Sequence, residues 1–134
     1  MVKVLLALLF VAVPALAGAQ EASLATATPA PSDISGTWIR SDGSARIHVA
    51  SCGNQICATD TWLRDTDGDE AVGDKLVMSL TPSGQAAFSG FGYDVKRDKK
   101  YSLQISLEGG SRMKTEGCVL AGIVCKTMRW MRLK

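Results

Sequence analysis

Apolar and polar residues alternate along several short segments of this chain, a pattern typical of β-strands with one buried face. The clearest segment runs from Tyr101 to Leu107, where four large apolar residues alternate with three polar ones. The same period of two recurs over 46–49, 75–80 and 126–130. Turn-forming glycine, proline, asparagine and aspartate residues separate these segments. Because no segment after residue 36 keeps a helical period for the length of a globular helix, the pattern predicts an all-β domain.

The runs between turns predict eight strands. Their approximate ranges are 36–41, 44–51, 56–63, 75–81, 85–93, 100–107, 112–118 and 124–132. Eight short antiparallel strands with hairpin links favour an up-and-down barrel, because closure removes the exposed edges of the sheet. A sandwich of two sheets is the alternative. A barrel of this size has room for packed side chains or for one small ligand.

The alternation also predicts which side chains point into the barrel. The predicted inward residues are Ile47, Val49, Met78, Leu103, Ile105, Leu107, Met113 and Met128. Methionine side chains adapt to irregular shapes, so this interior suits a hydrophobic ligand. Met78, Tyr101, Leu103 and Met128 are the residues expected to contact it. The alternative is that the same side chains fill the interior completely.

The first 19 residues have the three parts of an export signal. Lys3 is followed by an uninterrupted apolar run from Val4 to Val13, which is too short to span a bilayer. Small residues then offer cleavage after Ala17 or Ala19. The sequence thus predicts a signal peptide at 1–19 and a periplasmic location, with secretion as the alternative. Residues 20–32 are rich in Ala, Thr, Ser and Pro and predict a flexible linker before a barrel domain at 33–134.

The charges of the whole chain nearly balance, with 15 Lys and Arg against 13 Asp and Glu. They are unevenly distributed, since residues 94–134 carry most of the basic side chains. In a barrel the two halves of the chain lie side by side and neutralise each other. We therefore expect no nucleic-acid partner. No membrane span is expected either, because no other apolar run approaches the length that a bilayer requires. A monomer is the simplest state, with a dimer left open.

Four cysteines form two pairs that are close in sequence, Cys52 with Cys57 and Cys118 with Cys125. Four cysteines allow three pairings, and the local pairing demands least of the fold. Cys118 and Cys125 are expected to face each other across an Ala121-Gly122 turn, and Cys52 and Cys57 across a four-residue tip. A metal site is the alternative, but the spacings differ from those of zinc sites. Export to an oxidising compartment favours two disulfides.

The first and last strands each carry a tryptophan, in Gly36-Thr37-Trp38 and in Trp130-Met131-Arg132. A closed barrel brings these segments together, so that an arginine can cover an indole ring and plug one end. Arg132 shares the parity of Trp130 and is the expected partner of Trp38, in preference to Arg129. The role predicted for this pair is barrel closure.

Several segments together resemble a bacterial family known as domain of unknown function 2147 (DUF2147). In order, they are Gly36-Thr37-Trp38, Ser51 to Cys57, Trp62-Leu63, Gly90 to Asp94, Tyr101-Ser102-Leu103, Gly117 to Leu120, Cys125 and Trp130-Met131-Arg132. The resemblance covers Gly36 to Arg132 and implies an exported, lipocalin-like barrel with no assigned activity. The family usually has a longer loop before its fourth strand, where this chain has only Asp65 to Asp74.

The residues that carry catalysis in common enzymes are sparse. His48 is the only histidine and has outward parity, so a catalytic triad lacks its base. Asp60 has no carboxylate partner at a fixed spacing. The run from Asp65 to Glu70 resembles the start of a calcium loop, but the required glycine and the final glutamate are missing. A solvated hairpin loop is therefore expected here, with weak calcium binding as the alternative. The sequence therefore predicts a protein that is not an enzyme and holds no metal or cofactor.

The function predicted from these features is that of a periplasmic, lipocalin-like protein that binds a small hydrophobic or amphipathic molecule. The alternative is a cell-envelope interaction module with a filled core and no ligand. Such a module would resemble a protease inhibitor or serve in a stress response. Under that alternative, the flexible segment from Glu21 to Asp33 would reach into a partner protein.

Overall fold

The computed structural model describes residues 11–15, 17–19 and 27–134. Most of the predicted signal peptide and the first part of the predicted linker lie outside these residues. Ahead of the strands is a 3-10 turn, η1 (Pro31–Ile34). The ring of Pro31 restricts φ there, and the Asp33 carboxylate accepts a hydrogen bond of 2.9 Å from the Ala30 N–H. The turn buries Ile34, and its first two residues, Pro31 and Ser32, are the last two of the predicted linker.

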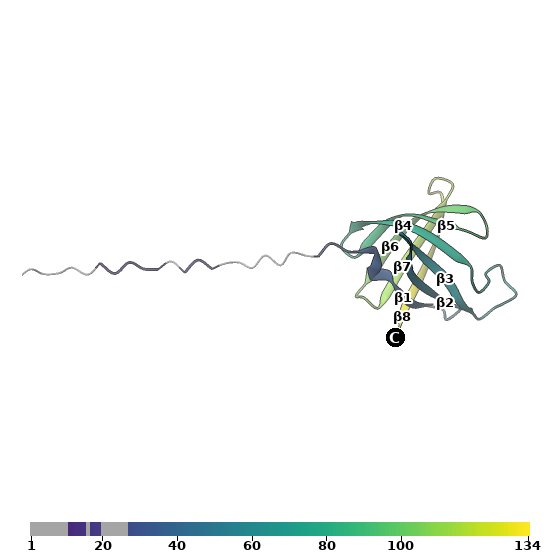
Figure 1. The fold of residues 1–134 in the computed structure, drawn as a ribbon, viewed down its shortest axis with the longest axis horizontal. Helices are drawn as coiled ribbons and strands as arrows, with labels where there is room; N and C mark the ends of the chain where they lie inside the picture. Colours follow the sequence, from purple (N-terminus) through teal and green to yellow (C-terminus); the bar gives the residue numbers. More distant parts are fainter. Residues whose placement is uncertain (1–10, 16, 20–26) are drawn as a thin grey trace, which may run out of the picture.

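Eight strands follow η1 and wind into one barrel (Figure 1). They are β1 (Gly36–Arg40), β2 (Ala45–Cys52), β3 (Gln55–Leu63), β4 (Lys75–Gly84), β5 (Ala87–Asp94), β6 (Lys99–Glu108), β7 (Arg112–Val119) and β8 (Val124–Leu133). Each strand pairs antiparallel with the next one in sequence, and β1 also pairs with β8. The predicted up-and-down barrel is confirmed, and the closed sheet excludes the two-sheet sandwich.

β4 runs past its predicted end at residue 81 and includes Pro82. Proline cannot donate a ladder hydrogen bond and is tolerated in a strand at a bulge. The register between β4 and β5 shifts between Pro82 and Gly84, which supplies this bulge. A second irregularity lies between Arg46 and Ile47 on β2, so that Ile47 pairs with Asp60 on β3.

Both predicted disulfides form, and no cysteine is free among the described residues. Cys118 and Cys125 are register partners, and the Ile123 N–H donates to the Leu120 carbonyl across the expected Ala121-Gly122 turn (3.2 Å). The geometry expected for the other disulfide was wrong. Cys52 pairs with Gln55 across a two-residue tip, while Cys57 pairs with Ala50. The bond is diagonal, because Cys52 and Cys57 lie two positions apart on the same face of the hairpin.

Up-and-down topology gives the barrel two different ends. We call the end with η1 and the β2–β3, β4–β5 and β6–β7 hairpins the sealed end, and the opposite end the open end. Trp38, Phe88, Ile34 and Val49 are the largest side chains that are fully buried among the described residues. Trp38 and Ile34 lie at the sealed end and close the barrel on that side.

Candidate functional site

The barrel contains a cavity of about 400 Å³ that extends from Ile34 toward the open end. All four predicted ligand-contacting residues, Met78, Tyr101, Leu103 and Met128, line it. Of the other residues predicted to point inward, only Leu107 does not line the cavity, although it packs against the core. The interior of the described barrel is therefore not completely filled.

Small inward side chains account for much of this space. Ala58 and Gly117 line the cavity wall, where larger residues would project into it. A Cβ atom added at Gly117 would meet the side chain of Leu103 at 3.6 Å, an ordinary van der Waals distance. Backbone packing therefore does not require glycine at this position. Both residues alternate in phase with the inward-facing residues of their strands, so their small size was a visible signal in the sequence that the expectation of large inward side chains left out.

The sealed end is built around Trp38, whose ring is fully buried. The indole N–H donates to the Ile34 carbonyl at 2.9 Å, which ties η1 across the end of the barrel. The guanidinium carbon of Arg132 lies 4.2 Å from the centre of the Trp38 ring. The same guanidinium donates to the backbone carbonyls of Ser35 (2.6 Å), Asp33 (2.8 Å) and Gly110 (2.9 Å). These contacts place Arg132, and not Arg129, over Trp38.

Gly36 makes this arrangement possible. Its φ of +131° is a conformation that residues with a side chain rarely adopt. A Cβ atom there would lie 2.8 Å from the Arg132 guanidinium. The glycine in Gly36-Thr37-Trp38 therefore makes room for the arginine that covers the tryptophan.

At the open end, Arg40 covers Trp130 in a similar way, with 5.3 Å between its guanidinium carbon and the ring centre. Arg40 donates to both carboxylate oxygens of Glu70 at 3.1 and 3.0 Å and to the Ser44 hydroxyl at 3.1 Å. The Arg40 Nε is buried and has no hydrogen-bond partner among the described residues. Trp130 donates to the Thr115 hydroxyl at 3.1 Å.

Arg40 binds one side of the β3–β4 loop through Glu70, and Arg97, on the β5–β6 loop, binds the other side. Arg97 donates to the Asp94 carboxylate at 2.9 Å, to Asp74 at 3.4 Å and to the Asp69 carbonyl at 2.6 Å. The pKa of Asp74 is lowered, chiefly by a hydrogen bond from the Ala71 N–H and also by the basic side chains of Lys96 and Arg97. The β3–β4 loop (64–74) is thus held by one arginine on each side.

Asp60 is a functional group of the cavity that its sequence position alone did not reveal. It pairs with Ile47 on the inward face of the barrel and lines the cavity. The pKa of Asp60 is raised to about 6. Burial is the largest cause, followed by the nearby carboxylates of Glu70 and Asp74, while Arg40 and Arg97 lower the pKa by less. The sequence showed no carboxylate at a fixed spacing from Asp60, because Glu70 and Asp74 approach it from the β3–β4 loop, which has no periodic pattern. Among the described residues, no hydrogen bond to the Asp60 carboxylate is present.

The acidic run from Asp65 to Glu70 does not converge on a point. The Asp65 carboxylate accepts from the Asp67 N–H at 2.9 Å, and Glu70 turns toward Arg40. Within the part of the chain that the structure describes, the carboxylates of this run form no group of three close enough to share one ion.

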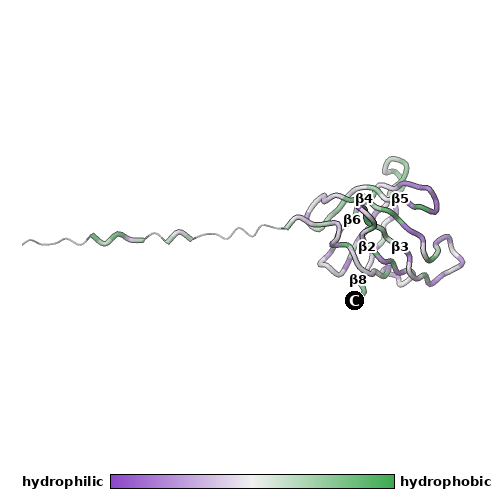
Figure 2. The backbone as a smooth tube through the Cα atoms, in the orientation of Figure 1, coloured by the Kyte–Doolittle hydropathy of each residue, from purple (hydrophilic) through white to green (hydrophobic). Residues whose placement is uncertain are grey.

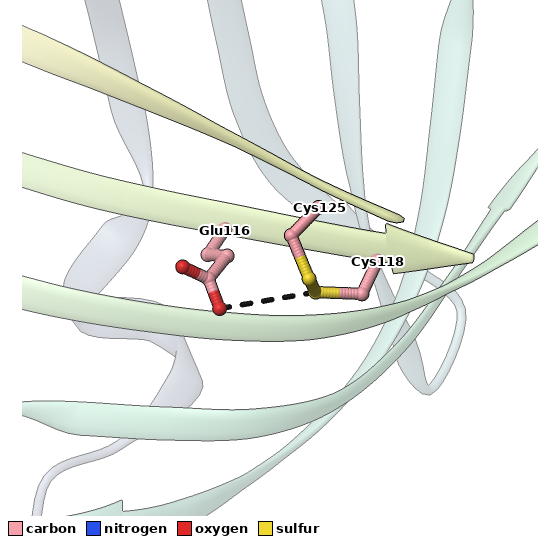
Figure 3. A group of neighbouring side chains, drawn as sticks. All are labelled: Glu116, Cys118 and Cys125. Atoms are coloured by element: carbon pink, nitrogen blue, oxygen red, sulfur yellow. Dashed lines mark hydrogen bonds between the residues drawn. A yellow bond between two sulfur atoms is a disulfide. The ribbon is translucent and has the colours of Figure 1, made fainter. Parts of the chain in front are cut away.

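A different group of potential ligands, Glu116, Cys118 and Cys125, lies on β7 and β8 (Figure 3). The Cys118 Sγ lies 3.8 Å from a Glu116 oxygen. Both sulfurs belong to the disulfide, so neither has a proton to donate or a thiolate to offer a metal. This cluster is therefore a packed disulfide. His48 is exposed, with its Nδ1 3.3 Å from the Thr37 hydroxyl, and lies outside the cavity.

The β7–β8 loop also exposes apolar side chains. Leu120, Ile123 and Val124 are 70%, 82% and 52% exposed. In Figure 2 this loop projects from the open end as a hydrophobic tip beside the hydrophilic β5–β6 loop. Among the described residues, no helix has the length and hydrophobicity required to cross a membrane.

Two solved structures resemble this barrel. One is the protein HP1028 from Helicobacter pylori, described as belonging to the lipocalin family. Its TM-score is 0.50 at 16% identity, over 75% of this chain and 82% of that one. The other is a redesigned β-barrel, with a TM-score of 0.45, 16% identity and coverage of 77% and 93%. The first likeness supports a lipocalin-like fold.

No curated protein matches this sequence. The model of a family described as an uncharacterized protein conserved in bacteria, DUF2147, matches residues 36–132, which span all but the last residue of the eight strands. The resemblance in the sequence analysis is confirmed. The chain belongs to the DUF2147 family, with a closed lipocalin-like barrel held by two hairpin disulfides.

Proposed function

We propose that this protein is a periplasmic, non-enzymatic binding protein that holds a small hydrophobic or amphipathic molecule inside its barrel. The observation that carries the proposal is the cavity of about 400 Å³, whose wall is mostly apolar. Pockets that bind small molecules have volumes of roughly 300–1,000 Å³ and are apolar with a few polar groups. The two disulfides and the bacterial family support a location outside the cytoplasm.

The four proposed contact residues come from three strands. Met78 lies on β4, Tyr101 and Leu103 on β6 and Met128 on β8. Met78 and Leu103 are buried, whereas Tyr101 and Met128 are partly exposed, and they line the cavity together. An apolar tail would lie between these side chains and displace water from them. The polar groups of an amphipathic ligand would remain near the open end, where the charged residues gather.

Native mass spectrometry of the protein purified from the periplasm tests whether a molecule of discrete mass is bound. Binding of the neutral dye N-phenyl-1-naphthylamine then tests the location. Ala58→Leu fills the cavity wall, and Ala87→Leu adds the same atoms to the outward face of β5. We expect Ala58→Leu to weaken dye binding by about tenfold or more and Ala87→Leu to leave it nearly unchanged.

Leu103→Ala provides an independent check, because it enlarges the cavity. We expect it to change dye affinity by more than its loss of stability explains. Equal dye binding by wild type, Ala58→Leu and Leu103→Ala would show that the dye does not enter the barrel and would contradict the proposal.

A further inference from the structure

Among the described residues, most of the acidic side chains that line the cavity near Asp60 are ion-paired, whereas Asp60 and the exposed Asp69 are not. Glu70 is bound by Arg40, and Asp74 and Asp94 are bound by Arg97. Lys96 adds a second cation to Asp74, at 3.6 Å. Asp60 makes no ion pair among the described residues, and its carboxylate receives no hydrogen bond from them. Two further basic residues line the cavity, Lys75 and Lys126, and both are exposed.

Asp60 also occupies the position at which a head group would sit. On β3 it shares the inward face with Ile56 and Ala58, which lie nearer the sealed end. Its register partner on the neighbouring strand β2 is Ile47. A molecule whose tail filled the apolar cavity would therefore bring its polar end to Asp60, just below the β3–β4 loop.

The sign of the surrounding charges favours one kind of head group. Asp60 is approached by Glu70 and Asp74 from the β3–β4 loop, by Arg40 from β1 and by Arg97 from the β5–β6 loop. Both arginines already bind carboxylates, so an anionic head beside Asp60 would find no free guanidinium and would face three acids. Lys75 and Lys126, which make no ion pair among the described residues, are exposed and are not among the main charges that shift the pKa of Asp60. A cation beside Asp60 would instead neutralise a half-buried charge that has no counter-ion.

We propose that the cavity binds a monocationic amphiphile, an ammonium group on an apolar chain, and that the ammonium forms an ion pair with the Asp60 carboxylate. This inference rests on the proposed function and specifies its ligand class. A neutral head group, such as an alcohol, donates a hydrogen bond to Asp60 but leaves its charge uncompensated. Because of this ion pair, the protein is expected to bind an amine more tightly than an alcohol of the same chain length.

The titration of Asp60 makes the binding depend on pH in a defined direction. Its pKa is about 6 in the unliganded barrel. An ammonium pairs with the ionised carboxylate, so binding requires Asp60 to lose its proton when the pH is below 6. We expect the affinity for the amine to be constant above about pH 7 and to fall by up to tenfold for each pH unit below about 6.

Calorimetric titration of the full protein with dodecylamine, dodecanol and dodecanoate tests the inference at concentrations where the ligands are monomeric. At pH 7.5 we expect dodecylamine to bind about tenfold or more tightly than the other two ligands. Asp60→Asn should remove both the preference for the amine and the pH dependence, and the variant should still bind dodecanol. Asp69→Asn is the matched control, because it removes an equal charge from an exposed loop position that also lines the cavity.

The outcomes separate this inference from the function on which it rests. If the three ligands bind equally well, or if dodecanoate binds best, the ammonium proposal is wrong while the binding function stands. Loss of the amine preference in Asp69→Asn as well as in Asp60→Asn would show a general charge effect and would also overturn it. If none of the ligands binds and the naphthylamine dye does not bind either, the binding function itself is wrong.

Discussion

The two ends of the barrel each carry an arginine over a tryptophan, and both pairs come from β1 and β8. Trp38 pairs in register with Arg132, and two residues further along, Arg40 pairs with Trp130. The arginine donors differ in their acceptors. Arg132 donates to three backbone carbonyls, whereas Arg40 donates to the Glu70 carboxylate and to a serine hydroxyl.

Backbone carbonyls of a packed turn are fixed, but a glutamate on a loop of 11 residues can turn away. The pair at the sealed end is therefore part of the rigid scaffold. The pair at the open end holds the β3–β4 loop over the cavity through contacts that water or a ligand can replace. The same two residue types thus close one end and leave the other adjustable.

The largest effect is expected from the ring at the sealed end. Trp38→Ala removes a fully buried indole and should lower the free energy of unfolding by about 3–5 kcal/mol. Trp62→Ala removes an indole that is 40% exposed and should cost about 1 kcal/mol or less. Denaturant unfolding of the two variants measures both values. Similar losses would contradict the view that the buried Trp38 ring contributes more to the packed core than the partly exposed Trp62 ring does.

The two disulfides allow the ends to be compared, because the two bonds close loops of similar length and so remove similar chain entropy from the unfolded state. Cys52–Cys57 lies at the sealed end and Cys118–Cys125 at the open end, with sequence separations of 5 and 7. Replacing either pair with serine should lower the free energy of unfolding by about 2 kcal/mol. A difference above about 1 kcal/mol between the double variants would mean that local packing, and not loop closure, dominates.

The two arginines are expected to differ in what they stabilise. Arg132→Met leaves three backbone carbonyls without this donor and should lower the free energy of unfolding by about 1–3 kcal/mol. Arg40→Met breaks a partly exposed ion pair and should cost less than about 1 kcal/mol. It should, however, speed amide hydrogen exchange in residues 64–74, which Arg132→Met should not. Faster exchange in that loop in both variants would show that the ends are coupled.

The smallest effect concerns the ionisation of Asp60. Its pKa is raised in the folded state, from 3.8 to about 6, so the folded protein binds this proton more tightly than the unfolded chain. The contribution of Asp60 to stability is therefore fully present below pH 4 and is lost as the pH rises to about 6. After allowance for solvent screening, the loss is on the order of 1 kcal/mol.

Asp60→Asn removes this titration. At pH 7.5 the variant should be more stable than the wild type by about the same amount, and the difference should shrink toward pH 4. Thermal unfolding from pH 4 to 8 measures the difference. A stability difference that does not change with pH would show that Asp60 ionises as freely in the barrel as in the unfolded chain.

The fold was readable from the sequence because strand alternation and turn residues are local signals. Parity identified the inward residues and the partner of Trp38, and the closure of the sheet followed from the number of strands. The Cys52–Cys57 disulfide was predicted, but its diagonal geometry was missed because the tip was counted as four residues. The Gly53-Asn54 turn, which sets the register, was nevertheless visible in the chain.

The charged residues around Asp60 at the open end of the cavity could not be predicted from the sequence in the same way. Glu70, Asp74 and Arg97 lie in loops without periodic pattern, so sequence position did not indicate that they surround Asp60. The inward parity of Asp60 with Ala58 was a usable signal. The position of Asp60 was not certain from parity, since a bulge between Arg46 and Ile47 shifts the pairing beside it.

The pairing of β1 with β8 also constrains the order in which the barrel can form. β1 is the first of the eight strands to leave the ribosome, yet one of its two neighbours is the last strand to arrive. Until then, one edge of β1 has no ladder partner, and Arg132 is not available to cover Trp38. Closure is a long-range contact and is expected to be a late, slow step of folding. The Trp38–Arg132 contact therefore forms only when all eight strands are present, so a shortened chain cannot complete the seal.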